Sequence, residues 1–116
     1  MMEWKLEMTD QAENDMRGIY GYVSDVLLES GVAGKLLNRL IGRIREVKKN
    51  PKIYPLYPNE PWRSMGIRRV NEGKYAILLL PVDSKNTIYI TNVMYGGRNI
   101  DQILEESAGD YESMLK

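Results

Sequence analysis

The sequence of 116 residues contains neither cysteine nor histidine, and both absences narrow what the protein can do. Without cysteine, thiolate catalysis and Cys-ligated zinc are excluded, and folding requires no oxidising compartment. Without histidine, a Ser-His-Asp triad, an HExxH zinc site and any histidine acid–base pair are excluded as well. An enzyme built on this chain would have to transfer protons with tyrosine, lysine, arginine, aspartate or glutamate.

Long hydrophobic runs and a targeting segment are also lacking. The longest apolar run, Tyr75 to Val82, has the length of a strand and is far shorter than the ~18 residues of a membrane span. The first residues lack the basic-then-apolar layout of a signal peptide. Carboxylates do not cluster at metal-ligand spacing outside the acidic first helix. We therefore expect a cytoplasmic protein without a membrane partner, a metal or another cofactor.

The net charge is zero, but the charges are segregated along the chain. Residues 1–34 carry two basic and seven acidic side chains, residues 35–75 carry eleven basic and three acidic ones, and residues 76–116 carry three basic and six acidic ones. The middle segment, at net +8, is a candidate surface for an anion or an acidic partner. Its charges could equally pair with the acidic first helix or face water.

The first half of the chain predicts a strand and two helices. Glu3 to Met8 alternates polar and apolar residues, which is typical of a half-buried strand. Asp10 is a candidate N-cap, with Glu13 completing a capping box, for a helix that ends at Glu29-Ser30-Gly31. A second amphipathic helix spans about 32–49 and ends before Pro51. The short link between the helices predicts an antiparallel hairpin.

The second half predicts three strands and a final helix. The proline-rich residues 51–66 are expected to form an ordered loop, because their aromatic side chains must pack on something. Strands are expected at 67–71, 74–83 and 87–95, with Glu72-Gly73 as the first hairpin turn.

The last strand should place Ile88, Ile90 and Asn92 on one side and Tyr89, Thr91 and Val93 on the other. A helix then begins near Asn99 or Ile100.

These elements, in the order β-α-α-β-β-β-α, indicate an α+β fold. We expect the N-terminal strand and the helical hairpin to pack on one face of a small antiparallel sheet, leaving the other face partly open. One domain of residues 1–106 is expected, followed by a polar, acidic and loosely held tail of residues 107–116.

Three stretches in this order resemble the RelE/ParE superfamily of bacterial toxins: TDQAENDMRGIYGYV, GIRRVNEGKYAILLLPVD and IYITNVMYGGRNIDQIL. The resemblance implies the toxin of a type II toxin–antitoxin (plasmid stabilisation) module that arrests growth. It also implies a cognate antitoxin, whose disordered tail folds across a groove of the toxin. A homodimer, or a hetero-oligomer with the antitoxin, is compatible with this reading.

The superfamily has two branches, and the RelE-like branch cleaves mRNA on the ribosome. Cleavage through the 2′-hydroxyl needs a base, cations for the charged phosphorane and an acid for the leaving oxygen. Under this alternative, Arg68 or Arg69 would clamp the phosphate, Tyr95 would be the acid where relatives often carry histidine, and Arg98 would be a second clamp.

Sequence features favour the ParE-like branch, whose members inhibit DNA gyrase. Asn71 stands where the RelE branch has an arginine, and the basic run after the last strand is reduced to Tyr95-Gly96-Gly97-Arg98. The pI near 6.3 is low for a protein that must bind phosphates in competition with salt. The position of Arg68, seven residues before Tyr75, matches the ParE spacing. A third alternative is an inactive member that survives as an antitoxin-binding module.

Eight residues are candidates for binding the target or the antitoxin. In this reading Gly96 and Gly97 permit positive φ angles in a recognition turn that launches the last helix. The eight candidates are Trp62, Arg63, Arg68, Arg69, Tyr95, Gly96, Gly97 and Arg98. Replacing Arg68 or Arg98 by alanine should then reduce toxicity without changing stability.

Overall fold

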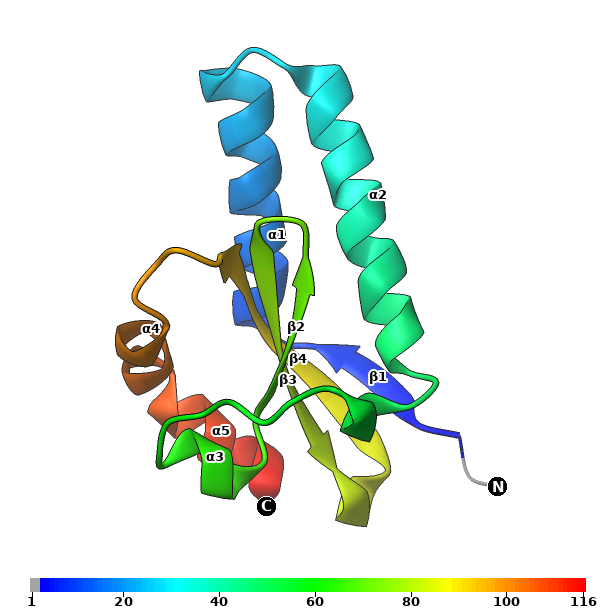
Figure 1. The fold of residues 1–116 in the computed structure, drawn as a ribbon, viewed down its shortest axis with the longest axis vertical. Helices are drawn as coiled ribbons and strands as arrows, with labels where there is room; N and C mark the ends of the chain where they lie inside the picture. Colours follow the sequence, from blue (N-terminus) through cyan, green and yellow to red (C-terminus); the bar gives the residue numbers. More distant parts are fainter. Residues whose placement is uncertain (1–2) are drawn as a thin grey trace.

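The computed structural model describes residues 3–116, and Figure 1 shows a twisted sheet with helices on both sides. Met1 and Met2, which the expected domain includes, lie outside the described residues. The helices and strands are β1 (Lys5–Met8), α1 (Asp10–Gly21), α2 (Ser30–Val47), α3 (Trp62–Met65), β2 (Arg68–Glu72), β3 (Tyr75–Val82), β4 (Thr87–Tyr95), α4 (Ile100–Glu106) and α5 (Ala108–Leu115).

The sheet has the strand order β1-β4-β3-β2. The pairs β2–β3 and β3–β4 are antiparallel, as expected, but β1 joins the edge of β4 in parallel. The apolar run in β3 is explained by its position, because both faces of this central strand are covered. Pro81 lies beyond Leu79, the last residue of β3 that pairs with β2, so its missing N–H interrupts no ladder there.

Thr9, and not Asp10, caps α1. The Thr9 hydroxyl accepts a hydrogen bond from the Ala12 N–H at 3.1 Å and donates one to the Thr91 carbonyl at 3.1 Å. An aspartate could accept the first bond but could not donate the second, so threonine both caps the helix and attaches it to β4. The expected capping box with Glu13 is therefore wrong.

The helical hairpin is confirmed, and it covers one face of the sheet. The chain continues from α1 through a π-helical turn, Tyr22–Val26, before α2 returns antiparallel to α1. Apolar residues of both helices and of the sheet form the first core cluster, which includes Met16, Leu40, Ile44, Leu79 and Ile90.

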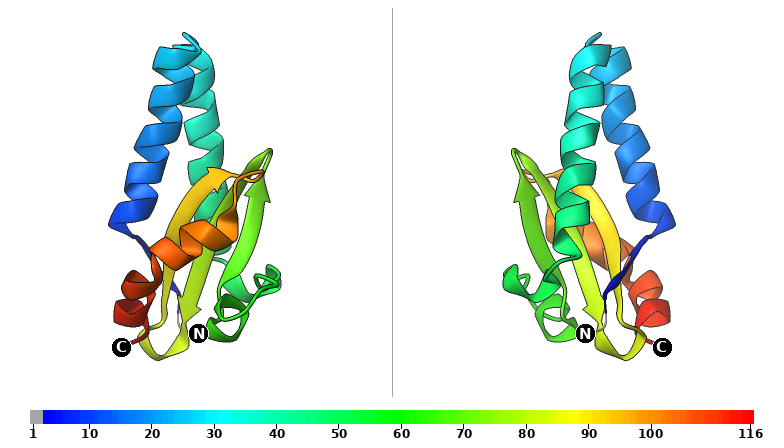
Figure 2. Two further views of the ribbon diagram at one scale, coloured as in Figure 1. Left: turned by 90° about the vertical axis from the view of Figure 1, so that its left-hand side faces the viewer. Right: turned by 90° about the vertical axis from the view of Figure 1, so that its right-hand side faces the viewer.

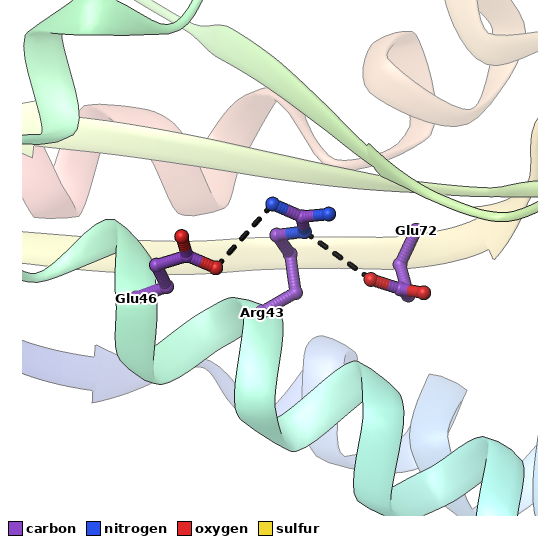
Figure 3. Close-up of polar contacts among 3 residues, drawn as sticks. All are labelled: Arg43, Glu46 and Glu72. Atoms are coloured by element: carbon purple, nitrogen blue, oxygen red, sulfur yellow. Dashed lines mark hydrogen bonds and ion pairs between the residues drawn. The ribbon is translucent and has the colours of Figure 1, made fainter.

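An ion-pair network joins the hairpin to the sheet. Arg43 of α2 contacts the carboxylate of Glu72, at the end of β2, with 3.2 Å between Nε and Oε1. Its Nη1 lies 3.3 Å from Oε2 of Glu46 on the same helix. Figure 3 shows Arg43 between the two carboxylates. The guanidinium therefore links α2 to the end of β2, next to the β2–β3 turn. That turn consists of Gly73 and Lys74, one residue later than expected, with Gly73 at φ 58°.

The opposite face of the sheet is covered, contrary to expectation. The 51–66 loop, α3, α4 and α5 pack there around a second core cluster that includes Tyr57, Trp62 and Leu104. Residues 107–116 are not a loose tail, because α5 buries Tyr111 completely and Met114 almost completely. Two apolar residues at i and i+3 in a short acidic stretch were enough to dock this last helix.

A β-bulge changes the facing of β4 halfway along. Leu78 pairs with Asn92 and Leu79 with Ile90, so Thr91 is the extra residue. Val93 therefore packs in the first core cluster, and Asn92 faces α5, where its Oδ1 accepts a hydrogen bond of 2.7 Å from Tyr111. The predicted alternation is correct up to Ile90 and wrong beyond it.

Candidate functional site

A groove runs along the free half of β4. Strand β1 pairs only with residues Thr87–Ile90, and among residues 3–116 no strand continues the sheet beside residues 91–95. A cavity of about 730 Å³ opens there instead, with α1 as one wall. It is lined by Asn14, Asp15, Gly18, Ile19, Tyr22, Tyr75, Val93, Met94, Tyr95 and Arg98.

A second, smaller cavity extends the groove towards the C-terminal helices. Its volume is about 220 Å³, and it shares Asp15, Val93, Met94 and Arg98 with the first cavity. Its remaining lining residues are on α1, α4 and α5 or between the last two helices. The groove therefore follows a free strand edge between two sets of helices, a geometry that accepts an extended segment of another chain.

Asp15 occupies the place that a neighbouring strand would take. Its Oδ2 accepts a hydrogen bond from the Val93 N–H at 2.9 Å, and its Oδ1 accepts one from Gln11 at 2.8 Å. Burial raises the pKa of the Asp15 carboxyl, although these two hydrogen bonds and the positive charge of Arg98 oppose the shift. The carboxylate thus satisfies a strand N–H that would otherwise be exposed in the groove.

Tyr95 stands at the end of β4, where the groove opens. It is opposite Tyr75 in the β3–β4 register, and the two rings meet edge to face with centroids 6.2 Å apart. Its side chain is about half exposed, at 51%. The pair gives the groove an aromatic wall.

The two glycines after Tyr95 are explained by the space that their missing side chains leave for neighbouring groups. They are not explained by their φ angles. Neither has a positive φ, so this part of the prediction is wrong. A Cβ on Gly97 would lie 2.8 Å from Cε1 of Tyr95, and a Cβ on Gly96 would lie 3.0 Å from an Nη atom of Arg69. The glycines therefore let the Tyr95 ring and the Arg69 guanidinium pack directly against the turn.

Arg98 and Arg69 lie on the two sides of this turn. Arg98 contributes to both cavities of the groove, and its backbone N–H closes the turn on the Tyr95 carbonyl at 3.1 Å. Arg69 lies on the β2 side, where its Nε donates to Asn71 at 3.0 Å. The structure thus brings together five predicted site residues: Arg69, Tyr95, Gly96, Gly97 and Arg98.

The other three predicted site residues lie elsewhere. Arg68 is at the opposite end of β2, and its Nη1 donates to the carbonyls of Tyr54 at 2.7 Å and Lys52 at 3.2 Å. Trp62 is buried against Tyr57, with ring centroids 5.9 Å apart. Arg63 is exposed on α3 and lines neither cavity. Arg68 and Trp62 hold the 51–66 loop to the sheet.

The helix that follows the turn is also fixed to this loop. The Asn99 side chain caps α4 by accepting from the Gln102 N–H at 3.2 Å. Asp101 accepts hydrogen bonds from the Tyr57 hydroxyl and from Asn59. Burial and the bond to Asp101 raise the pKa of Tyr57 to about 12. Both ends of the Tyr95–Arg98 turn are therefore anchored.

The sequence alone did not reveal the groove residues that α1 and the π-helical turn contribute. Asp15 and Tyr22 line the groove together with Gly18 and Ile19. One signal was available, since Asp15 is four residues before Ile19 and three after Ala12, so a carboxylate interrupts the edge of an apolar helical face.

Two further properties concern the described residues as a whole. In residues 3–116, no three aspartate, glutamate, histidine or cysteine side chains gather as a metal site requires. None of the helices in this range has the length and apolar character needed to cross a bilayer.

Comparisons with known proteins agree on the fold. Among solved structures, the chain is similar to a toxin–antitoxin structure titled "Chromosomal ParDE TA system from P. aeruginosa", with a TM-score of 0.67, 18% identity and coverage of 80% of this chain and 96% of that one. It is also similar to a mutant of the E. coli toxin RelE in the free state, with a TM-score of 0.63, 14% identity and coverage of 94% and 98%. A third similar structure is the RelBE2 toxin–antitoxin complex from Mycobacterium tuberculosis, with a TM-score of 0.61, 14% identity and coverage of 81% and 99%.

Sequence comparison supplies the family. Among curated protein sequences, none matches this chain significantly. Residues 6–100 match the family model described as the ParE toxin of the type II toxin–antitoxin system parDE. This match covers most of the chain, including β1 from Leu6 on, the helical hairpin, strands β2 to β4 and the Tyr95–Arg98 turn. The chain therefore belongs to the ParE toxin family of type II toxin–antitoxin systems, within the RelE/ParE superfamily.

Proposed function

We propose that the protein arrests growth as a ParE-like inhibitor of DNA gyrase and that the β4 groove binds its protein partners. The observation that carries the proposal is the match of residues 6–100 to the ParE toxin family. It is supported by the position of Arg68, which with Arg69 is one of the two residues predicted as the phosphate clamp of a nuclease. Its guanidinium donates to two loop carbonyls at the end of β2 that is far from Tyr95. The family match supports the ParE branch, for which the resemblance implies gyrase as the target.

The charge of the groove supports the same conclusion. Arg98 lies close enough to Asp15 to influence its pKa, so a carboxylate accompanies this cation in the groove. A phosphodiester at Arg98 would meet the negative charge of Asp15, which disfavours a phosphate site. An acidic or polar side chain of a protein partner can bind Arg98 while apolar groups fill the space beside Tyr75 and Tyr95.

We further propose that a cognate antitoxin neutralises the toxin by placing an extended segment in the same groove. The groove follows the edge of β4 beyond β1, where the Asp15 carboxylate holds the Val93 N–H, and it continues between α1 and the C-terminal helices. A segment bound there would cover Tyr95 and Arg98.

The test is a DNA supercoiling assay with gyrase and the purified chain, freed of its antitoxin. We expect inhibition by the wild type and at least a tenfold loss of potency for Arg98→Ala, which corresponds to about 1.4 kcal/mol of lost contact free energy. The matched control is Arg63→Ala, which removes an exposed arginine outside the groove and should inhibit like the wild type.

A different result would redirect the assignment. If folded wild-type protein leaves gyrase active at large molar excess, cleavage of mRNA on programmed ribosomes is the next activity to measure. Arg69, Tyr95 and Arg98 are then the candidate catalysts, because Tyr95 and Arg98 line the groove and Arg69 lies beside Gly96. Absence of both activities, with antitoxin binding intact, would indicate the binding module without toxicity.

A further inference from the structure

Much of the positive charge of residues 35–75 gathers on one face of α2 and of the turn that ends it. Six basic side chains and one acidic side chain lie between Lys35 and Lys49, net +5, in a chain whose net charge is zero. At 3.6 residues per turn, positions 35, 39, 45 and 49 fall within about 120° of one another, on the side opposite the buried Leu40. We define the α2 basic face as Lys35, Arg39, Arg45 and Lys49, all of which are exposed.

These four charges are not neutralised within the described part of the fold. Among residues 3–116, the cations in ion pairs are Arg43 and Lys52, and no ion pair joins α1 to α2. The one carboxylate between Lys35 and Lys49 is Glu46, and Arg43 holds it at 3.3 Å. The helix dipole favours cations near the end of α2 but not at Lys35, in its second turn. The α2 basic face therefore suits an anionic partner outside the chain.

Other carboxylates border the α2 basic face and restrict how such a partner can lie. Glu29 is the N-cap residue of α2 and precedes Lys35 by about 9 Å along the helix axis. On α1, Asp10 and Glu13 are exposed together with Arg17, so the net charge of these three side chains is negative. An extended anion is therefore expected to follow α2 and not to cross the hairpin.

The shape and composition of the α2 basic face narrow the kind of anion. The right-hand view of Figure 2 shows α2 along the outer surface, with no other element in front of it. From Lys35 to Lys49 this convex rod is about 21 Å long. The other exposed residues in this range are all polar or glycine: Asn38, Gly42, Glu46 and Lys48. Protein partners and membranes are bound largely through apolar side chains, which this face lacks, whereas phosphates require only cations and polar donors.

We propose that the α2 basic face binds the phosphate backbone of duplex DNA without reading its sequence. Arg39 and Arg45 are about 120° apart around α2, so they lie on two flanks of the helix. The major groove of DNA, about 12 Å wide, admits an α-helix between its two rows of phosphates. The major groove of duplex RNA is too deep and narrow for this arrangement, so the geometry favours DNA.

This surface is separate from the β4 groove. None of the four residues of the α2 basic face lines either cavity of the groove, so a protein partner in the groove and DNA on α2 can be bound together. The inference therefore does not depend on the proposed function. The pI of the whole chain, near 6.3, implies that the binding is weak and strongly dependent on salt.

The experiment is fluorescence anisotropy of a labelled DNA duplex of about 20 base pairs with the full chain, freed of its antitoxin, in about 25–200 mM KCl. We expect the logarithm of the binding constant to fall with the logarithm of the salt concentration with a slope of about −3 to −4, since each of four phosphate contacts contributes about −0.9. Two duplexes of unrelated sequence should bind within about threefold of each other.

A double variant tests whether α2 makes these contacts. Arg39→Gln with Arg45→Gln should weaken DNA binding at least tenfold at about 50 mM KCl and reduce the magnitude of the salt slope by about 2. Glutamine is a good helix former, so the fold is kept, which a circular dichroism melt verifies. The matched control is Arg63→Gln with Lys116→Gln, which removes two exposed cations outside α2 and should bind DNA like the wild type.

Three results would overturn the proposal. The first is no DNA binding by the folded wild type at about 25 mM KCl, where phosphate contacts are strongest. The second is DNA binding that the α2 double variant and the control variant weaken equally. The third is displacement of the DNA by polyglutamate at equal charge concentration, which would identify an acidic protein as the partner. An RNA duplex of the same length that binds more weakly than the DNA supports the groove arrangement, and one that binds as tightly contradicts it.

Discussion

Replacing Arg68 by alanine separates a structural role of this arginine from a role in the target site. The substitution removes a hydrogen bond of 2.7 Å to the half-buried Tyr54 carbonyl and one of 3.2 Å to the exposed Lys52 carbonyl. A hydrogen bond from a charged donor contributes about 1.5–3 kcal/mol when partly buried, and the exposed bond contributes less than about 0.5 kcal/mol. We expect a loss of about 2 kcal/mol in the free energy of unfolding.

Thermal unfolding followed by circular dichroism measures this loss. For a chain of this size, 2 kcal/mol corresponds to a decrease in Tm of roughly 6–12 °C. Arg63→Ala is the control, because Arg63 is exposed and the change should stay within about 0.5 kcal/mol. Gyrase inhibition by Arg68→Ala, measured well below its Tm, should match that of the wild type.

The opposite pattern would refute this reasoning. An Arg68→Ala protein with the Tm of the wild type and no inhibition would mean that Arg68 contacts the target and that its two carbonyl bonds contribute little. The sequence alone predicts that outcome, whereas the structure predicts reduced stability with full gyrase inhibition. This one variant therefore distinguishes the two predictions.

Three further predictions concern single side chains. Tyr111→Phe removes the only hydrogen bond that the buried Asn92 side chain makes in residues 3–116, and urea unfolding should show a loss of about 1–3 kcal/mol. For Asp15, whose folded pKa is raised by burial, the stabilising contribution is present below its unfolded pKa, about 4, and is lost as the pH rises through the folded pKa. Asp15→Asn should therefore have a higher Tm than the wild type at pH 7, and the difference between the two Tm values should shrink towards pH 3. Gly97→Ala forces the Tyr95 ring to move, because its Cβ would lie 2.8 Å from Cε1, and should weaken gyrase inhibition while urea unfolding stays within about 1 kcal/mol of wild type.

Periodicity in the sequence predicted those elements whose structure is decided by local apolar spacing and capping residues. The helical hairpin, the three antiparallel strands and the start of α4 follow directly from apolar spacing and capping residues. The second half of β4 did not, because the bulge at Thr91 arises from tertiary hydrogen bonds to Thr9 and Leu78 that no local pattern encodes. The C-terminal helix was missed because only Tyr111 and Met114 mark its buried side.

The candidate site was predicted in part for a similar reason. The Tyr95–Arg98 turn is contiguous in sequence, so its composition identified it. Asp15 joins the groove from a helix some eighty residues earlier, and that contact depends on how α1 crosses β4. The role of Arg68 could not be predicted, because an arginine in an edge strand can equally bind phosphate or, as here, neighbouring carbonyls.

The parallel pairing of β1 with β4 has a consequence for synthesis. Lys5 pairs with Thr87, and Met8 pairs with Ile90, so β1 finds its partner only when the helical hairpin and the other strands have been synthesised. Contacts of such high sequence separation make folding slow and late. A nascent chain that lacks β4 therefore has neither the complete sheet nor the complete wall of the groove, and we expect the toxin to become active only after β4 and the Tyr95–Arg98 turn have been synthesised. An antitoxin that is synthesised during this interval can therefore be present before the toxin has folded.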